Sequence, residues 1–125
     1  MPHITVECSA NVETTHLDAL PRVVHEAAIA SGVAPLDALR TRLVVHDRYV
    51  IADDRPENKF IAVTARLGAG RSVEDKQRLV GAVMDAVVGQ LGAAERDTAL
   101  SVECQDIDPA SRVNRNNLAV RVGHG

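Results

Sequence analysis

Hydrophobic and polar residues alternate at four places along this chain of 125 residues, and this alternation predicts four β-strands. In the first, Ile4, Val6 and Cys8 share one face, while His3 and Thr5 lie on the other. The four strands are expected at residues 2–8, 39–50, 60–67 and 100–104. Each is expected to place one face in the core and the other toward polar surroundings.

Two stretches between these strands carry apolar residues at the spacing of an amphipathic helix. Thr14 or Thr15 could cap the first helix, and Gly32 would end it. Before the second, Ser72 with Asp75 resembles a capping box in which Asp replaces the usual Glu. Helices are therefore expected at 14–31 and 72–91.

The predicted elements form two strand-helix-strand units of similar length. They occupy about residues 2–52 and 58–106, and a tail at 107–125 is expected to hold a short strand over 118–122. Right-handed crossovers would place both helices on one face of a four-stranded sheet. We expect one α+β domain over 1–125, whose other sheet face keeps Val, Leu and Ile side chains that further copies of the chain must cover.

Composition indicates a core with few large side chains. Tyr49 and Phe60 are the only aromatic residues, and tryptophan is absent. Val, Leu, Ile and Ala must fill the interior, and small side chains bury less area each. Oligomerisation is a common remedy for a small core, and we expect it here.

Charge and cysteine content exclude several classes of function. A net charge of −3 and the scarcity of aromatic residues argue against nucleic-acid binding. No apolar run approaches the ~20 residues of a membrane span, and no secretory signal is visible. Cys8 and Cys104 are expected as reduced thiols, and the histidines lack metal-ligand spacing. We expect a cytoplasmic protein without metal, nucleic-acid or membrane partners.

Pro2 directly follows the initiator methionine. Methionine is efficiently removed before a small residue, and its removal would leave Pro2 with a free secondary amine. Burial and nearby cations lower the pKa of an amine, so this nitrogen could act as a general base near neutral pH. The alternative is a proline that merely starts a strand, where its missing N–H does no harm. Its position alone favours that alternative.

Three arginines are candidates for binding an anion. Arg40 and Arg42 share one face of the second predicted strand, and Arg71 directly precedes the cap of the second helix. Exposed N–H groups at a helix start favour an anion, and a guanidinium group holds a carboxylate through two bonds. For any single arginine, a solvated or ion-paired surface side chain is the commoner explanation. Gly68 and Gly70 more simply permit a tight turn, because a Walker lysine is missing.

Four blocks of sequence resemble the 5-carboxymethyl-2-hydroxymuconate isomerase family of the tautomerase superfamily. They are MPHITVECS, PLDALRTRL, GAGRS and NRNNLAV, and they span almost the whole chain in matching order. The resemblance implies a tautomerase-like fold of two β-α-β units, a homotrimer, and no metal or organic cofactor. It implies a polycarboxylated 2-hydroxymuconate substrate from aromatic-ring breakdown by the homoprotocatechuate route. It also favours the catalytic interpretation of the amino-terminal proline.

The resemblance further implies roles for single residues. Pro2 would be the base, Arg40 and Arg71 would bind the substrate, and Arg42 matches an adjacent family arginine. Asn116 matches one of two family asparagines expected at a subunit contact; Asn117 matches the other. The expected reaction takes the 2-hydroxyl proton from the dienol and returns a proton to a distal carbon, which gives a 2-oxo-3-ene acid.

Three other functions remain open on sequence alone. The chain could be a proline-based tautomerase of a different enol acid, or a non-catalytic trimeric module that binds an acidic metabolite. Hydration or dehalogenation would want a carboxylate, and Glu7 is a candidate by strand position only. The Gly-His-Gly tail and the segment 45–54, which includes His46, Arg48 and Tyr49, depart from the family pattern. They could line a pocket or an interface.

Overall fold

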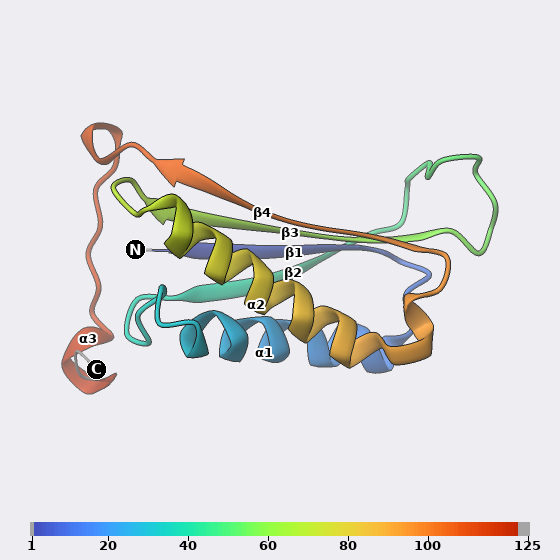
Figure 1. Ribbon diagram of the computed structural model, residues 1–125, viewed down its shortest axis with the longest axis horizontal. Coiled ribbons are helices and arrows are strands. Elements are labelled where there is room, and N and C mark those ends of the chain that lie inside the picture. The colour runs from blue at the N-terminus through green and yellow to red at the C-terminus, as the bar shows by residue number, and fades with distance from the viewer. Residues whose placement is uncertain (1, 123–125) are drawn as a thin grey trace.

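Four strands form one mixed sheet in the order β2-β1-β3-β4 in the computed structural model, which describes residues 2–122. The strands are β1 (His3–Ser9), β2 (Arg40–His46), β3 (Lys59–Gly68) and β4 (Thr98–Ile107). Helices α1 (Thr14–Ala30) and α2 (Val73–Leu91) lie together on one face of this sheet (Figure 1). The short elements are η1 (Gly92–Glu95), η2 (Pro109–Ser111) and α3 (Ala119–Val122).

The sheet consists of two β-α-β units joined through their first strands. β1 runs parallel to β2, β3 runs parallel to β4, and β1 and β3 pair antiparallel in the middle. Each parallel pair needs a crossover, which α1 and α2 provide. The predicted four-stranded sheet with two helices on one face is therefore confirmed.

The core lies between the sheet and the two helices. Strand residues Ile4 and Val63 and helix residues Leu20 and Leu79 are at most 2% exposed. All the large, fully buried side chains except Cys8 and Ser9 are aliphatic, as the composition predicted. Close approach of small side chains thus replaces the aromatic packing of a typical core.

Both cysteines are free thiols on the side of the sheet that faces the helices. Cys8 is fully buried, and burial raises its pKa to about 11. Burial also raises the pKa of Cys104. Both thiols are therefore protonated near neutral pH.

The ends of the helices follow local capping chemistry. Ser72 Oγ accepts a hydrogen bond from the Asp75 N–H at 3.1 Å, which confirms the predicted cap of α2. Gly92, with φ of 53°, ends that helix. The expected cap of α1 is wrong: Glu13 has the extended backbone of an N-cap, and Thr14 is already helical.

The second strand is shorter than its alternation predicted. It ends at His46, and residues 47–58 form a loop that projects from one end of the sheet (Figure 1). The Asn58 amide donates to the Ile51 carbonyl and to Asp53, and these bonds fold the loop back on itself. The alternating residues around Val50 therefore belong to a surface loop and not to a strand. Val50 itself is 79% exposed.

The expected strand over 118–122 is wrong, because Ala119–Val122 forms helix α3. Asn116 Oδ1 accepts from the Leu118 N–H at 3.0 Å, and the Val122 N–H donates to the Leu118 carbonyl. These bonds fold the backbone into a helical turn, so this segment does not pair with the edge of the sheet. The Gly-His-Gly tail lies outside the described residues.

The face of the sheet that the helices leave open, called here the uncovered face, is mainly polar. In the strand registers it holds His3, Thr5 and Glu7 of β1. Among the Val, Leu and Ile residues of the strands, only Val44 and Ile107 belong to it. The expectation that aliphatic side chains on this face require further copies is therefore wrong, and an oligomer needs other support.

No helix within residues 2–122 is long and apolar enough to cross a membrane. Among the same residues, no group of three or more His, Cys, Asp or Glu side chains is placed to hold a metal ion. The cytoplasmic location expected from the sequence stays a prediction.

Leu79→Ala tests the aliphatic core. We expect it to lower the free energy of unfolding by about 2–5 kcal/mol, because it leaves a cavity at a position with no exposed surface. Leu118→Ala, at a residue that is 48% exposed, should lower it by less than about 1 kcal/mol. Urea denaturation followed by circular dichroism at one protein concentration measures both. Equal losses would contradict the assignment of the core.

Candidate active site

The candidate residues gather at the end of the sheet where β1 begins. Pro2 is buried directly before this strand, and its carbonyl accepts a hydrogen bond from the Arg40 N–H at 3.3 Å. Because β1 is an inner strand, Pro2 is flanked by β2 on one side and β3 on the other. The loop between α1 and β2 and the turn between β3 and α2 lie at the same end (Figure 1).

Arg71 joins the two segments that flank Pro2. It donates from Nη1 to the Gly68 carbonyl at 3.1 Å and from Nη2 to the Val33 carbonyl at 3.3 Å. Gly68 ends β3 and Val33 precedes β2, so this bridge crosses the end of β1, the strand between them. A guanidinium group has five N–H donors, so the remaining ones are available to an anion.

Turn chemistry places Arg71 at this end. Gly70 has φ of 108°, which favours glycine, and this confirms that it serves a tight turn. Arg71 also lines a hollow formed by the end of α1 and the loop that follows it. Its other lining residues are Ile29, Gly32, Val33, Ala34, Pro35 and Leu36.

Arg40 and Arg42 lie beside His3 on the uncovered face. The Arg40 Nη2 atom is 2.9 Å from His3 Nε2, and the Arg42 Nη2 atom is 3.2 Å from His3 Nδ1. Burial lowers the pKa of His3 below its ordinary 6.5, and Arg40, Arg42 and Arg66 lower it further. The imidazole is therefore neutral near pH 7.

Sequence reasoning did not single out His3 or Arg66. His3 is nevertheless the residue that contacts both predicted strand arginines. Its partners are 37 and 39 residues away in the chain, so the contacts depend on the parallel register of β1 with β2. Strand alternation alone gives no such register.

Four guanidinium groups at this end have no carboxylate partner among residues 2–122. They belong to Arg40, Arg42, Arg66 and Arg71. Two ion pairs lie at the same end, Lys76 with Asp106 and Arg78 with Asp75, but neither includes one of these four groups. In addition, the buried Nε of Arg40 has no hydrogen-bond partner in the described part of the chain. This end therefore keeps four guanidinium groups outside any ion pair of the described residues, although the chain as a whole carries −3.

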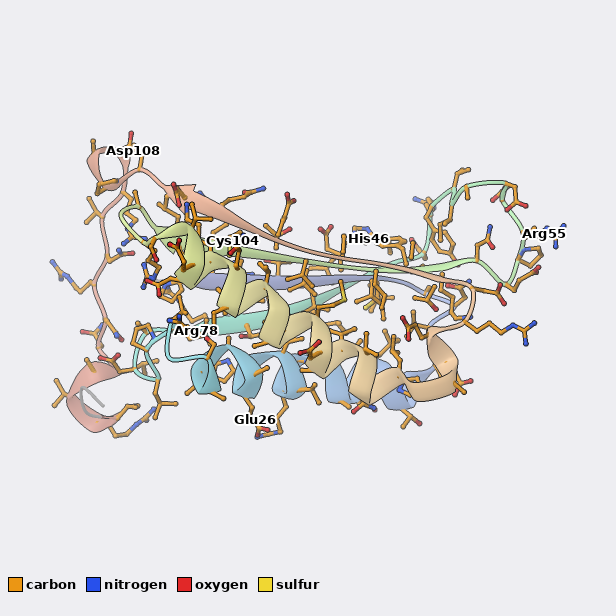
Figure 2. The ribbon with its side chains drawn as sticks, viewed as in Figure 1. Glu26, His46, Arg55, Arg78, Cys104 and Asp108 are labelled. Carbon is orange, nitrogen blue, oxygen red and sulfur yellow. The ribbon has the colours of Figure 1, made fainter. Side chains whose placement is uncertain are left out.

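The remaining candidates lie apart from this cluster. Glu7 binds His46 (labelled in Figure 2) at 2.9 Å on the uncovered face, about 16 Å along β1 from Pro2. Glu7 therefore lies away from Pro2, and its position does not support a role as the carboxylate of a hydration reaction. Tyr49 and His46 pack against Phe60, at the base of the loop 47–58. Asn116 donates to the carbonyl of Asp37 at 2.7 Å within its own chain.

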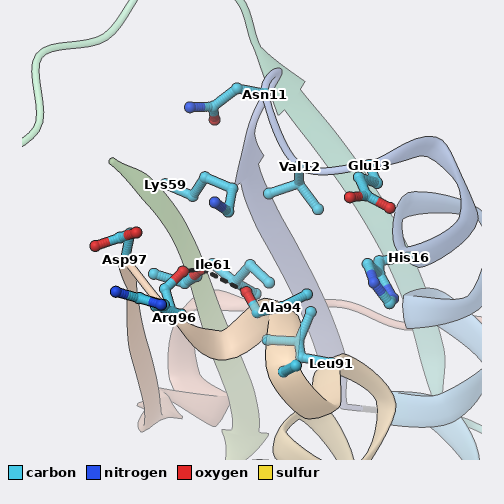
Figure 3. Close-up of a pocket in the computed structure, with 12 residues that line it drawn as sticks. Asn11, Val12, Glu13, His16, Lys59, Ile61, Leu91, Ala94, Arg96 and Asp97 are labelled. Atoms are coloured by element: carbon cyan, nitrogen blue, oxygen red, sulfur yellow. Dashed lines mark hydrogen bonds between the residues drawn. The ribbon is translucent and has the colours of Figure 1, made fainter. Parts of the chain in front are cut away.

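A separate pocket of about 230 Å³ lies at the opposite end of the sheet. Figure 3 shows Arg96 and Asp97 on one side of it and Glu13 and His16 on the other. Pro2 and the four arginines of the cluster do not line it. Both acidic and basic side chains line this pocket, and together they do not indicate one kind of ligand or reaction.

Solved structures with this architecture define the class of protein. The crystal structure of a 5-carboxymethyl-2-hydroxymuconate isomerase from Deinococcus radiodurans R1 matches with a TM-score of 0.88 and 26% identity, over 97% of this chain and 93% of that one. A fused 4-OT wild-type symmetric trimer matches with a TM-score of 0.71 and 26% identity, over 98% and 99%. The chain is an isomerase with a tautomerase-like fold.

Sequence comparison defines the family within that class. The sequence model of 5-carboxymethyl-2-hydroxymuconate isomerase matches residues 2–122. The 5-carboxymethyl-2-hydroxymuconate Delta-isomerase of Escherichia coli is 31% identical over 121 residues, which cover 94% of this chain and 96% of that one. The chain belongs to the 5-carboxymethyl-2-hydroxymuconate isomerase family, which confirms the resemblance of the four sequence blocks.

Arg71→Ala tests the bridge across the end of β1. We expect the free energy of unfolding to fall by about 1–3 kcal/mol, because two carbonyls lose a charged donor. Arg55→Ala is the control: that side chain is 69% exposed and pairs only with loop carboxylates, so its loss should stay under about 1 kcal/mol. Urea denaturation of both variants measures the difference. A loss no larger than that of the control would exclude a structural bridge.

Proposed function

We propose that Pro2 is the general base of this isomerase and that its substrate is 5-carboxymethyl-2-hydroxymuconate, a dienol polycarboxylate. The observation that carries the proposal is the position of Pro2, which is buried directly before β1 at the end of the sheet that holds four guanidinium groups without a carboxylate partner within residues 2–122. The names of the two most similar proteins described above support the substrate. The product is the 2-oxo-3-ene isomer.

The base would arise by removal of Met1. Pro2 then has a secondary amine at the strand tip, and both its burial and the nearby arginines disfavour the protonated form. General acid–base catalysis is most effective when the pKa of the base lies near the working pH. A proline still joined to Met1 has an amide nitrogen and takes up no proton.

The reaction needs one proton acceptor that later becomes a donor. The Pro2 amine takes the 2-hydroxyl proton, and the electron pair of that O–H bond forms the new C2=O bond. The C2=C3 electrons move to C3=C4, and the C4=C5 electrons take a proton from the Pro2 ammonium at C5. The proton that leaves the 2-hydroxyl group is returned at C5, and no electrons are gained or lost. The reaction therefore needs no cofactor.

Arg40 and Arg71 would bind the substrate carboxylates and stabilise negative charge on the 2-oxygen. Two backbone carbonyls fix the orientation of Arg71, and His3 contacts the Arg40 guanidinium group. Such fixed donors lose little freedom when the substrate binds, and they hold the dienol so that only one carbon meets the ammonium.

We further propose that the protein acts as a homotrimer in the breakdown of aromatic compounds by the homoprotocatechuate route. The match to a fused 4-OT symmetric trimer supports the assembly. So does the segment after β4, where Val113 and Val120 are 99% and 93% exposed. Exposed aliphatic side chains of this kind favour contact with another copy.

Retention of Met1 is the most direct test of the base. Protein verified by intact mass to lack Met1 should consume 5-carboxymethyl-2-hydroxymuconate, followed as loss of dienol absorbance. The same chain with Met1 retained should lose at least about 100-fold in kcat/KM, because general acid–base transfer typically contributes about 10² to 10⁴-fold. Pro56→Ala, in the exposed loop 47–58, should leave the rate unchanged.

Two outcomes would contradict the proposal in different ways. Full turnover by the Met1-containing protein would exclude Pro2 as the base. Faster turnover of a monocarboxylate enol, such as enol phenylpyruvate, would support a proline-based tautomerase with a different substrate.

A further inference from the structure

Arg78 lies near the start of α2 and joins that helix to the end of α1 (labelled in Figure 2). Its Nε donates to the Ser31 carbonyl at 3.0 Å, and its Nη2 donates to Asp75 Oδ1 at 2.8 Å. Ser31 is the C-cap of α1, and carbonyls at the end of a helix lack donors within that helix. Arg78 therefore supplies, from a second helix, a donor for the end of α1.

From Ser31 the contacts continue to Arg71. Ser31 Oγ accepts from the Val33 N–H at 3.2 Å and donates to the Ala28 carbonyl at 2.6 Å. The carbonyl of Val33 in turn accepts from Arg71 Nη2 at 3.3 Å. Ser31 thus fixes the N–H of the residue whose carbonyl orients Arg71.

The start of α2 connects Arg78 back to Arg71. Ser72, the N-cap of α2, directly follows Arg71, and its Oγ accepts from the Asp75 N–H at 3.1 Å. The hydrogen bond from Arg78 lowers the pKa of the Asp75 carboxyl group, so this group is charged near neutral pH. Five hydrogen bonds and one peptide bond therefore form a closed chain of contacts, called here the hydrogen-bond ring. Its members are Arg71, Ser72, Asp75, Arg78, Ser31 and Val33.

We propose that Arg78 is a positioning residue for the isomerase reaction, which holds the Arg71 guanidinium group in its binding orientation through the hydrogen-bond ring. This rests on the proposed function, in which Arg71 binds a substrate carboxylate beside Pro2. Arg78 acts on Arg71 and not on the substrate. A group that is already fixed loses less freedom on binding, and a misplacement of about 1 Å can cost about 100-fold in rate.

Arg71 has a second anchor outside the hydrogen-bond ring. Its Nη1 donates to the Gly68 carbonyl at the end of β3. Loss of Arg78 therefore loosens Arg71 without releasing it, because one hydrogen bond does not fix the plane of a guanidinium group. The effect on turnover should accordingly be smaller than that of Arg71→Ala.

Exposure separates this role from a role in stability. The Arg78 and Asp75 side chains are 53% and 39% exposed, and exposed ion pairs of this kind add little to the stability of a fold. Removal of Arg78 should thus change the orientation of Arg71 more than it changes global unfolding. A loss of kcat/KM without a matching loss of stability is the result that positioning predicts.

Steady-state kinetics of the Met1-free protein with 5-carboxymethyl-2-hydroxymuconate test the proposal. Arg78→Ala should lower kcat/KM by about tenfold and shift the midpoint of thermal unfolding by less than about 3 °C. Arg78→Lys keeps the charge but lacks the planar fork that reaches Ser31 and Asp75, so it should recover only a small part of the loss. Full recovery by lysine would show an effect of charge alone and would overturn the proposal.

A double-mutant cycle tests whether Arg78 acts through Arg71. If it does, Arg78→Ala should change kcat/KM less than about twofold in protein that already carries Arg71→Ala. Equal losses with and without Arg71 would mean that the two residues act independently, and this result would also overturn the proposal.

Arg22→Ala is the matched control. It removes one exposed arginine charge from α1, and Arg22 makes no ion pair among residues 2–122. This variant should leave kcat/KM unchanged.

Nuclear magnetic resonance of the Arg71 side chain gives a measurement that does not depend on turnover. Two Nη groups held by two carbonyls rotate slowly, so the wild-type protein should show separate Nη–H signals that Arg71→Ala removes. Arg78→Ala should broaden or merge these signals, and Arg22→Ala should not.

The two proposals can fail separately. If the signals respond to Arg78→Ala but the wild-type protein turns over no enol acid, the contact between Arg78 and Arg71 stands and the proposed function falls. If the wild-type protein is active and Arg78→Ala leaves kcat/KM unchanged, the proposed function stands and the positioning role falls.

Discussion

The parallel register between β1 and β2 is the constraint on which the site depends. It sets His3 opposite Arg40 and Thr5 opposite Arg42, so both guanidinium groups lie beside β1, the strand that follows Pro2. A shift by one residue would turn both arginines toward the helices, where the core is aliphatic. Burial of Ile4, Val6 and Leu43 against the helices therefore fixes the chemistry on the opposite face. The stability of the core and the geometry of the site have the same cause.

The crowding of unpaired cations at one end has a physical consequence for the free protein. Like charges held together destabilise the folded chain, and no ion pair among residues 2–122 includes Arg40, Arg42, Arg66 or Arg71. The neutral form of His3 limits this repulsion, because protonation would add a further positive charge. An anionic ligand removes the repulsion on binding, so part of its affinity comes from relief of strain already present. A site of this kind favours ligands with more than one negative charge.

Sequence patterns predicted the elements well because each depends on local signals. Alternation gave the strands, Ser72 marked the start of α2, and the two crossovers placed both helices on one face of the sheet. The errors arose where single side-chain hydrogen bonds decide the course of the backbone. The side chain of Asn116 turns the terminal segment into a helix, and the bonds of Asn58 close the loop after β2. Pro2 and the arginines were found through residue type and family resemblance, whereas His3 and Arg66 required the strand register.

The distribution of charge explains how a chain of net charge −3 can attract an anion. Several of its acidic residues lie in the loop 47–58, where Asp53 and Glu57 pair with Arg55, and this loop projects from the end of the sheet opposite Pro2 (Figures 1 and 2). At physiological ionic strength the field of an exposed charge decays over about 8 Å. A sheet strand of seven residues already spans about 23 Å, so the loop carboxylates are screened from the Pro2 end. An approaching carboxylate therefore responds to the local arginines and hardly to the net charge. The isoelectric point and the composition thus bear on solubility. Which anion can bind is decided instead by the strand register, because the register places the arginine side chains.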